Sequence, residues 1–228
     1  MRFIMELSRD EIKNENIRKT AKKLTDMMTS EEKIYQTLNS TPPIERLGIN
    51  GYDWWNEGLH GVARAGLATV FPQAIGLAAT WDETLAEQVA DAVSTEARAK
   101  YNMQQRMDDT GRYKGLTLWA PNINIFRDPR WGRGHETYGE DPYLTSRMGI
   151  RFIEGLQGHD ENYLKSAACV KHFAVHSGPE GLRHEFNAVV SKKDMYDTYL
   201  PAFKACIQEA HVEAVMGAYN RTNGEPCC

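Results

Sequence analysis

The sequence predicts an α/β fold of the (β/α)8 TIM-barrel type, and two observations lead to this class. Strand-like and helical segments alternate from residue 47 onward, which is typical of βαβ units and a parallel sheet. Unusual polar and aromatic residues follow each predicted strand, as in a barrel, whereas a doubly wound sheet gathers its site at one switch point. These residues are Trp55 and Glu57, Trp81 and Asp82, the loop at 127–133, Lys171 and His172, and Tyr219 and Asn220.

Residues 1–43 are predicted to form a helical extension and a linker in front of the barrel. The segments 8–11 (Ser-Arg-Asp-Glu) and 29–32 (Thr-Ser-Glu-Glu) fit capping boxes, in which a hydroxyl and a carboxylate satisfy free backbone N–H groups. The tripeptide Thr-Pro-Pro at 41–43 excludes a helix and predicts an extended linker. We therefore expect two parts, the N-terminal helical extension with its linker and a partial barrel at 44–228.

About five strands are predicted in the barrel part, with helices between them. Apolar residues spaced one turn apart predict helices at about 85–100 and 144–156, and 194–210 is also expected to be mostly helical. Because a closed barrel needs about eight strands and usually about 250 residues, we expect an incomplete barrel. The predicted strand segments are 48–53, 73–79, 116–125, 167–173 and 212–218.

Composition and charge exclude several classes of protein. The 228 residues are 41% hydrophobic and 25% charged, which is enough to build a core and excludes a disordered chain or a disulfide mini-scaffold. The net charge of −4 gives no reason to expect nucleic acid or an anionic membrane as a partner. No apolar run approaches the ~20 residues of a spanning helix, and Glu6 interrupts any signal-peptide core. The four cysteines lack metal-type spacing, so we expect a reduced, cytoplasmic chain.

Two aromatic and charged segments are candidates for ligand binding. The loop at 127–133 carries three arginines beside Trp131, which either clamp an anionic or polyhydroxyl ligand or pair with the acids of the same loop. The segment 54–57 (Trp-Trp-Asn-Glu) either grips a sugar with aromatic faces, a carboxamide and a carboxylate, or places core tryptophans beside a surface acid. The residues alone leave both pairs of alternatives open.

Lys171 and His172 end an apolar strand, where a lysine is costly to place unless it has a partner or a ligand. The histidines at 172, 176 and 184 raise the question of a metal site. Histidines four residues apart face one way only on a helix, and this stretch is predicted as a strand followed by a Gly-Pro loop. We therefore expect no metal ion. No phosphate-cradling glycine loop is present either, so we expect no cofactor, and we expect the cysteines in the core rather than as nucleophiles.

Six motifs follow one another along the chain: WNEGLHG at 55–61, FPQ at 71–73, ATWD at 79–82, the loop at 127–133, KHF at 171–173 and GAYN at 217–220. Together they resemble the N-terminal barrel of glycoside hydrolase family 3, in the branch of bacterial β-xylosidases and β-glucosidases. The resemblance covers the chain from about residue 25 to its last residue. Several independent motifs at matching spacing are far more specific than any single one.

This resemblance implies sugar-binding roles for six residues. Glu57 matches a carboxylate that binds sugar hydroxyls in the −1 subsite, and Tyr219 matches a tyrosine beside the nucleophile. Charge-assisted hydrogen bonds from such residues suit a neutral polyol and can tighten as the ring becomes oxocarbenium-like. The implied substrate-binding residues are Glu57, Arg133, Lys171, His172, Met216 and Tyr219.

The resemblance also implies a retaining β-glycosidase that removes single β-xylosyl or β-glucosyl units from non-reducing ends. Such enzymes need two carboxyl groups about 5–5.5 Å apart. The family's nucleophile and acid/base are expected beyond Cys228, so we assign no catalytic residue here and expect the 228-residue chain alone to be inactive. The alternative is a catalytically inactive sugar-binding or assembly fragment of such an enzyme.

Two further expectations concern the substrate and association. Glu57 is one methylene longer than an aspartate and would crowd the hydroxymethyl group of a hexose, so we expect xylosides to be preferred over glucosides. An incomplete barrel leaves strand edges and inner faces open, so we expect self-association or a need for the C-terminal part in trans. The expected partner is a small saccharide or oligosaccharide.

Overall fold

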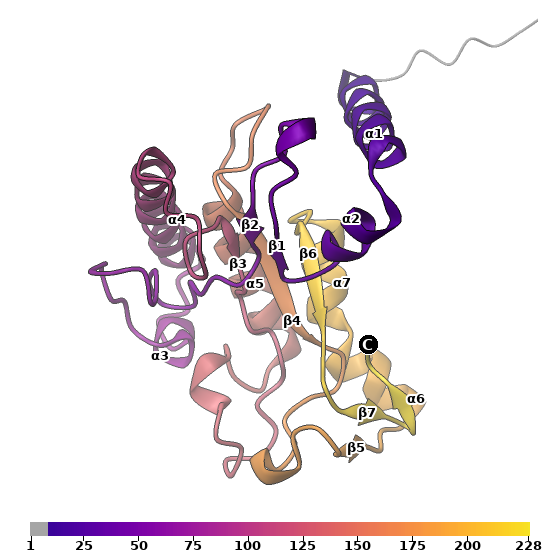
Figure 1. Cartoon of the computed structure of the whole chain (residues 1–228). Helices are drawn as coiled ribbons and strands as arrows, with labels where there is room; N and C mark the ends of the chain where they lie inside the picture. The colour runs from indigo at the N-terminus through magenta and orange to yellow at the C-terminus, as the bar shows by residue number, and fades with distance from the viewer. Residues whose placement is uncertain (1–8) are drawn as a thin grey trace, which may run out of the picture. The chain divides into compact units, whose positions relative to one another are not determined.

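The computed structural model describes residues 9–228 (Figure 1). The chain divides into two compact units, one up to Tyr52 and the other from Asp53 to Cys228. The two units are compact regions and not domains shown to fold independently. The division of the chain into an extension at 1–43 and a barrel at 44–228 therefore stays a prediction.

The first unit contains two helices and a short strand, as the capping and proline signals predict. Helix α1 spans Arg9–Met27, α2 spans Ser30–Tyr35, and β1 (Ser40–Thr41) pairs with β2 (Tyr52–Asp53). The capping box at Thr29 is confirmed: the N–H of Glu32 donates to Thr29 Oγ1 at 3.2 Å, and the N–H of Thr29 donates to Glu32 Oε2 at 2.8 Å. Ser8, which would cap the box predicted at 8–11, lies outside the described residues.

The main sheet of the second unit is parallel, with the strand order β3, β4, β6. Strand β3 spans Thr117–Leu118, β4 spans Ala167–Phe173 and β6 spans Ala214–Gly217. Five of the seven residues of β4 are buried, which explains why this strand is a continuous apolar run rather than an alternating one. The strands predicted at 167–173 and 212–218 are therefore confirmed, although β6 is shorter than predicted.

The prediction of a strand at 73–79 is wrong. This segment forms helix α3 (Ala74–Ala78), which buries Leu77 and Ala78. A helix of little more than one turn is too short to show a helical repeat of apolar residues, so its small side chains resemble a buried strand. Only part of 116–125 is a strand: β3 covers Thr117–Leu118, and beyond it a single parallel bridge joins Asn122 to Lys171 of β4.

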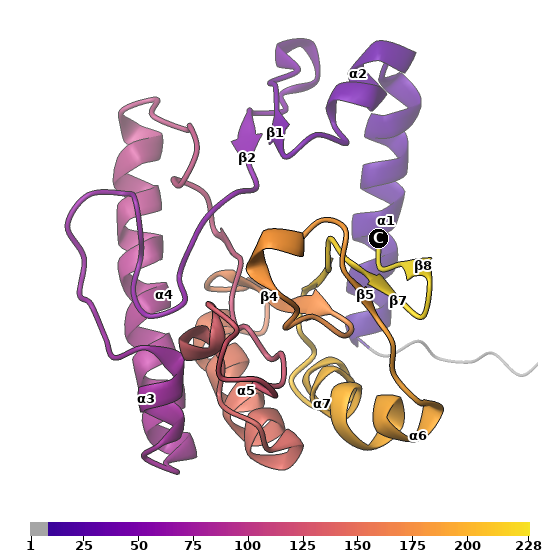
Figure 2. The same cartoon turned by 90° about the horizontal axis from the view of Figure 1, so that it is seen from below.

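Three helices pack side by side along the sheet (Figure 2). They are α4 (Glu83–Arg106), α5 (Pro142–Gln157) and α7 (Pro201–Gln208), so the two helices expected from the apolar spacing are present and α7 lies within the segment expected to be mostly helical. Helices α4 and α5 meet closely at Gly155, where a Cβ atom would lie 2.3 Å from the carbonyl oxygen of Glu87. The Ser94 hydroxyl donates to the carbonyl of Gly155 at 2.9 Å and fixes the same crossing.

Residues between the main elements form short helices and a second small sheet. Its strands are β5 (Asn187–Ala188), β7 (Arg221–Thr222) and β8 (Glu225–Pro226), in that order. Helix α6 (Lys192–Asp194) and a π-helical turn at Met195–Tyr199 precede α7. In the described part of the chain, no helix is long and apolar enough to cross a membrane.

Two of the four cysteines belong to the core as predicted, whereas the prediction is wrong for Cys227, which is half-buried, and for Cys228, which is exposed. Cys169 lies on β4 and Cys206 on α7, and both are buried. Burial raises the pKa of the Cys169 thiol to about 11 and that of Cys206 to about 12. Both thiols are therefore protonated near neutral pH and are poor nucleophiles.

Candidate functional site

A cavity of about 340 Å³ lies beside the carboxyl end of β4 in the second unit. It is lined by groups of both charge signs, which come from the segment after β2, the loop before α5 and β4 itself. Carboxyl ends of parallel strands are where barrel proteins assemble their sites. The charged lining residues are Glu57, Arg64, Arg133, Glu136 and Lys171.

Lys171 is buried at the end of β4, with only 5% of its surface exposed. Its Nζ atom lies 3.8 Å from Oε2 of Glu57. Burial lowers the pKa of Lys171 below its ordinary value, and the negative charge of Glu57 partly offsets this effect. A buried lysine with a partner is what the position at the end of an apolar strand predicted.

Glu57 is held at both of its carboxylate oxygens. Trp55 Nε1 donates to Oε1 at 3.2 Å, while Lys171 approaches Oε2. The Trp55 ring stacks on Trp119, with the centroids 5.0 Å apart, so the donor to Glu57 is itself fixed. Trp55 therefore serves as a support for the carboxylate in addition to any contact with a ligand.

Asn56 anchors the backbone that carries Glu57. Its Nδ2 donates to the carbonyls of Asp53 and Thr117, both at 3.1 Å, and its Oδ1 accepts from the N–H of Gly115 at 2.7 Å. The side chain is almost completely buried and fully engaged in these bonds. The proposed use of this carboxamide to grip a sugar is therefore wrong, because its role is to tie the segment after β2 to β3.

Arg133 forms a bidentate ion pair with Glu136 at the edge of the cavity. Its Nε donates to Oε1 at 2.8 Å and its Nη2 donates to Oε2 at 2.6 Å. Burial opposes ionisation of Glu136, but the hydrogen bonds and charge of Arg133 prevail and lower the pKa of this carboxyl below its ordinary value. Arg130 likewise pairs with Asp128. Two of the three arginines in the loop at 127–133 are therefore paired with nearby acids, which is one of the two alternatives left open by the sequence.

His172 lies behind the cavity wall and is held by Asn124. The backbone N–H and the Nδ1 atom of His172 both approach Asn124 Oδ1 at 2.9 Å, and Asn124 Nδ2 donates to the His172 carbonyl at 2.9 Å. Because an amide oxygen only accepts, Nδ1 carries the proton, and Nε2 accepts from Nη1 of Arg133 at 3.3 Å. Burial lowers the pKa of His172, so the ring is neutral.

The remaining predicted residues lie farther from this group. Met216 on β6 is the register partner of Lys171 on β4, so it stands beside the cavity wall. Tyr219 instead stacks on His184, with the ring centroids 5.0 Å apart, and is not among the residues that line the cavity. The structure thus gathers Glu57, Arg133, Lys171 and His172, places Met216 next to them and leaves Tyr219 outside the cavity.

Sequence reasoning did not identify Asn124 or Glu136 as parts of the site. Glu136 stands three residues after Arg133, a spacing that could have suggested an ion pair. Asn124 gives no local signal, because its partner His172 is distant along the chain. Within the part of the chain that the structure describes, no three His, Cys, Asp or Glu side chains gather as metal ligands would.

The fold and the cavity together define an α/β protein of the TIM-barrel type whose site suits a small polar molecule. Paired carboxylates and cations around a concave cavity provide both acceptors and charged donors, which a ligand with many hydroxyl groups can use. The chain belongs to glycosyl hydrolase family 3, because residues 17–228 match the model of that family's N-terminal domain.

Relatives by sequence include two xylosidases. The chain is 49% identical to a xylan 1,4-beta-xylosidase of Xylanibacter ruminicola, in a match that covers 94% of this chain and 25% of that protein. It is 46% identical to a probable exo-1,4-beta-xylosidase of Aspergillus fumigatus, over 91% of this chain and 28% of the relative. The chain thus spans about a quarter of the length of these relatives.

Solved structures show the same fold. An exo-beta-xylosidase of family 3, in complex with a xylobiose aziridine probe, matches 90% of this chain and 27% of its own chain, with a TM-score of 0.81 and 36% identity. A beta-glucosidase from Kluyveromyces marxianus in complex with glucose matches 90% of this chain and 24% of its own, with a TM-score of 0.76 and 30% identity. These likenesses confirm the barrel-type α/β fold.

Proposed function

We propose that this chain supplies the sugar-binding side of a retaining β-glycosidase that removes single β-xylosyl units from non-reducing ends. The observation that carries the proposal is the pairing of Lys171 with Glu57 in the wall of a polar cavity, beside the ion pair of Arg133 and Glu136. The xylosidase relatives and the xylobiose-probe complex of a structural neighbour support this substrate class.

The paired charges suit a neutral sugar better than a charged ligand. The carboxylate of Glu57 accepts hydrogen bonds from hydroxyl groups, whereas Lys171 and Arg133 donate to hydroxyl oxygens. Lys171 faces Glu57 and Arg133 pairs with Glu136, so these four charges balance one another, and Arg64 adds one positive charge to the lining. Bonds from the carboxylates strengthen as the sugar ring gains positive charge in the transition state.

The chain alone is proposed to bind a sugar without cleaving it. A general acid near neutral pH needs a raised pKa, but Arg133 lowers the pKa of Glu136. Glu57 is engaged by Trp55 and Lys171 and is assigned to binding. The nucleophile and the acid/base are proposed to lie beyond Cys228 in the whole protein.

Preference for xylosides is proposed to come from Glu57. Glu57 lines the cavity, and its side chain is one methylene longer than that of an aspartate. We expect this methylene to crowd the hydroxymethyl group of a glucosyl unit. A steric difference of this size discriminates by about 1–3 kcal/mol, so glucosides are expected as slower substrates rather than excluded ones.

The experiment incubates the 228-residue chain with aryl β-xyloside and aryl β-glucoside and measures xylose binding in parallel by calorimetry. The proposal expects binding of xylose that Glu57→Ala weakens, with no turnover of either glycoside. Robust turnover that Glu57→Ala abolishes would overturn the assignment of Glu57 to binding. A chain that binds no sugar at all would contradict the proposed function.

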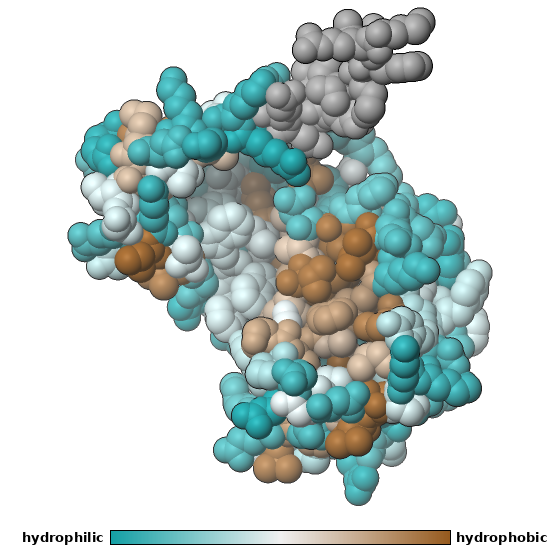
Figure 3. All heavy atoms as spheres, turned by 90° about the vertical axis from the view of Figure 1, so that its right-hand side faces the viewer, coloured by the Kyte–Doolittle hydropathy of each residue, from teal (hydrophilic) through white to brown (hydrophobic). Residues whose placement is uncertain are grey.

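We also propose that the isolated chain associates through the open edge of β6. Among the described strands, β6 pairs only with β4, so its other edge offers unpaired backbone groups. Val215 on β6 is 45% exposed and Ile207 on α7 is 44% exposed. Figure 3 shows apolar side chains gathered on this side of the molecule. The open edge of β6 is the observation that favours the alternative, a catalytically inactive sugar-binding or assembly fragment.

A further inference from the structure

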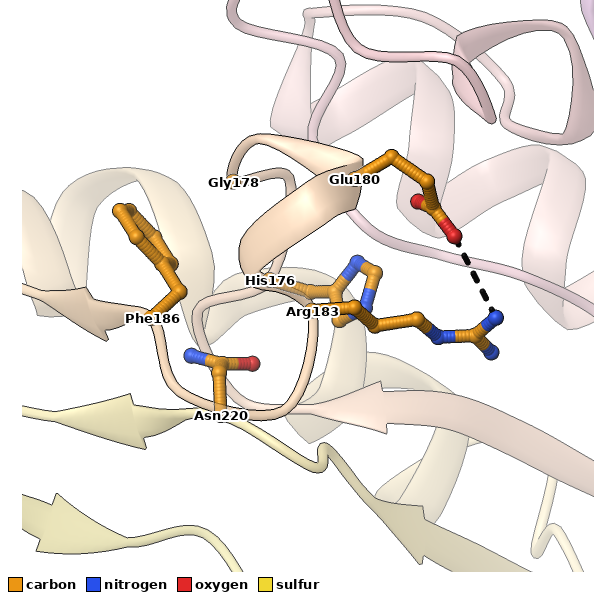
Figure 4. A pocket seen from close by; sticks show the side chains of 6 residues that line it. All are labelled: His176, Gly178, Glu180, Arg183, Phe186 and Asn220. Atoms are coloured by element: carbon orange, nitrogen blue, oxygen red, sulfur yellow. Dashed lines mark hydrogen bonds and ion pairs between the residues drawn. The ribbon is translucent and has the colours of Figure 1, made fainter.

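A small cavity lies between the segment that follows β4 and the segment that follows β6, away from the sugar-binding cavity (Figure 4). Its volume is about 10 Å³, which is close to the least that one water molecule needs. A sugar, a phosphate or a hydrated ion is too large for it. The cavity is lined by His176, Gly178, Glu180, Arg183, Phe186 and Asn220.

Three polar atoms from this lining are buried and have no hydrogen-bond partner: His176 Nδ1, Arg183 Nε and Asn220 Oδ1. His176 is 6% exposed and Asn220 is 2% exposed, so bulk water does not satisfy them. The amide of Asn220 cannot be turned to remove the problem, because its Nδ2 already donates to the carbonyls of Val175 and Arg221, both at 2.8 Å. Buried polar atoms of this kind are usually paired, and three in one cavity point to a missing partner.

We propose that one ordered water molecule occupies this cavity and bridges the three atoms. The Nε–H of Arg183 donates to the water oxygen, and the two water hydrogens are donated to Asn220 Oδ1 and His176 Nδ1. One donor and two acceptors are what a single water with three bonds satisfies. A metal cation does not fit, because the guanidinium of Arg183 would face it.

The proposed bridge assigns a tautomer to His176. With Nδ1 as the acceptor from the water, the ring proton resides on Nε2 and the imidazole is neutral. Burial and the charge of Arg133 lower the pKa of His176 to about 4, which agrees with a neutral ring at pH 7. The ring also stacks on His172, with the centroids 4.6 Å apart.

The water would act as a positioning element for Tyr219. It joins Arg183 to Asn220, the residue that follows Tyr219 in the chain. The guanidinium carbon of Arg183 lies 5.5 Å from the centre of the Tyr219 ring, and His184 stacks against the same ring. The bridge thus fixes both the backbone beside Tyr219 and a side chain that covers its ring.

Two measurements on the 228-residue chain test the proposal directly. A crystal structure at a resolution that shows ordered water should reveal one density peak within hydrogen-bond distance of all three atoms. Nitrogen-15 spectra of the histidines should show His176 with its proton on Nε2. An empty cavity, a direct bond between His176 and Asn220, or a proton on Nδ1 would overturn the proposal.

The variant His176→Phe tests the positioning role, because it keeps an aromatic ring and removes the ring nitrogens, among them the proposed Nδ1 acceptor. The bridge should be lost, and the ring signals of Tyr219 should shift because Arg183, which covers that ring, loses its link to Asn220. His159→Phe, at an exposed histidine, is the matched control and should leave Tyr219 unchanged. If the Tyr219 signals of His176→Phe are the same as those of His159→Phe, the positioning role is wrong.

Discussion

The Nζ atom of Lys171 lies 3.8 Å from Oε2 of Glu57 and thereby joins the end of β4 to the segment after β2. The side chain of Lys171 is 6% exposed, whereas that of Glu57 is 31% exposed. The pair therefore has a buried donor and a carboxylate that faces the cavity. This arrangement holds the carboxylate in place before any ligand arrives, which lowers the cost of ordering it on binding.

Glu57→Gln is expected to destabilise the chain by about 1–3 kcal/mol, because it leaves the buried ammonium of Lys171 without its counter-charge. The cost is smaller than for a fully buried pair, since Glu57 is partly exposed. The pKa of Lys171 should fall further, because the charge of Glu57 is what raises it against burial. Urea unfolding and carbon-13 titration of the lysine side chains measure the two effects, and an unchanged Lys171 titration would contradict the account.

Arg133→Lys is expected to destabilise the chain by about 1–3 kcal/mol, since an ammonium cannot replace the two parallel bonds to Glu136. The pKa of Glu136 should rise toward its ordinary value. The matched control is Arg130→Lys, which breaks the same kind of pair with Asp128 at an exposed site and should change stability little. Equal losses in both variants would show that burial of the Arg133 pair contributes nothing.

Stability is expected to fall as the pH falls from about 6.5 to about 4. The pKa of His176 is about 4 in the folded chain against an ordinary value of 6.5, so the unfolded state binds the proton first. The contribution of this residue is complete above pH 6.5 and amounts to about 3 kcal/mol at most. His172, whose pKa is also lowered by burial, acts in the same direction.

Urea midpoints measured between pH 4 and pH 7.5 check this dependence. His176→Phe should flatten the curve in part, with the remainder kept by His172. The exposed control His159→Phe should follow the unsubstituted chain. A midpoint that does not change with pH over this range would contradict the direction assigned to both buried histidines.

Val215→Lys is expected to reduce self-association of the isolated chain. A charge on the open edge of β6 opposes strand pairing with a second chain. Val189→Lys is the matched control, because Val189 is 84% exposed but does not lie on the main sheet. Sedimentation at micromolar concentration measures the effect. A monodisperse monomer without any substitution would show that the edge of β6 does not drive association.

Periodic and strongly patterned segments could be predicted from the sequence. Leu85, Val89 and Val93 recur one turn apart, and they lie on α4 as expected. The apolar run at 167–173 is a buried parallel strand, also as expected. The segment at 73–79 could not be assigned, because a five-residue helix of small side chains gives no repeat to detect.

The candidate site shows a similar limit. Glu57, Arg133 and Lys171 could be selected because charged residues after predicted strands are unusual, and the structure brings all three to one cavity. Some supports come from partners that are distant in the chain, such as Asn124 for His172, and no local pattern reveals them, whereas Trp55 and Glu136 lie within three residues of Glu57 and Arg133. Tyr219 follows β6 as predicted, yet its ring lies against Arg183 and His184 rather than in the cavity.

The most direct test of the central claim is a titration of the 228-residue chain with xylose, followed by the side-chain signals of Lys171, Glu57 and Arg133 in NMR spectra. The account predicts that these signals shift together with a single dissociation constant, that Glu57→Gln weakens this constant, and that the signals of the exposed pair of Asp128 and Arg130 stay in place. Shifts confined to other parts of the chain, or none at xylose concentrations that saturate a xylosidase, would contradict the claim that this chain carries the sugar-binding residues.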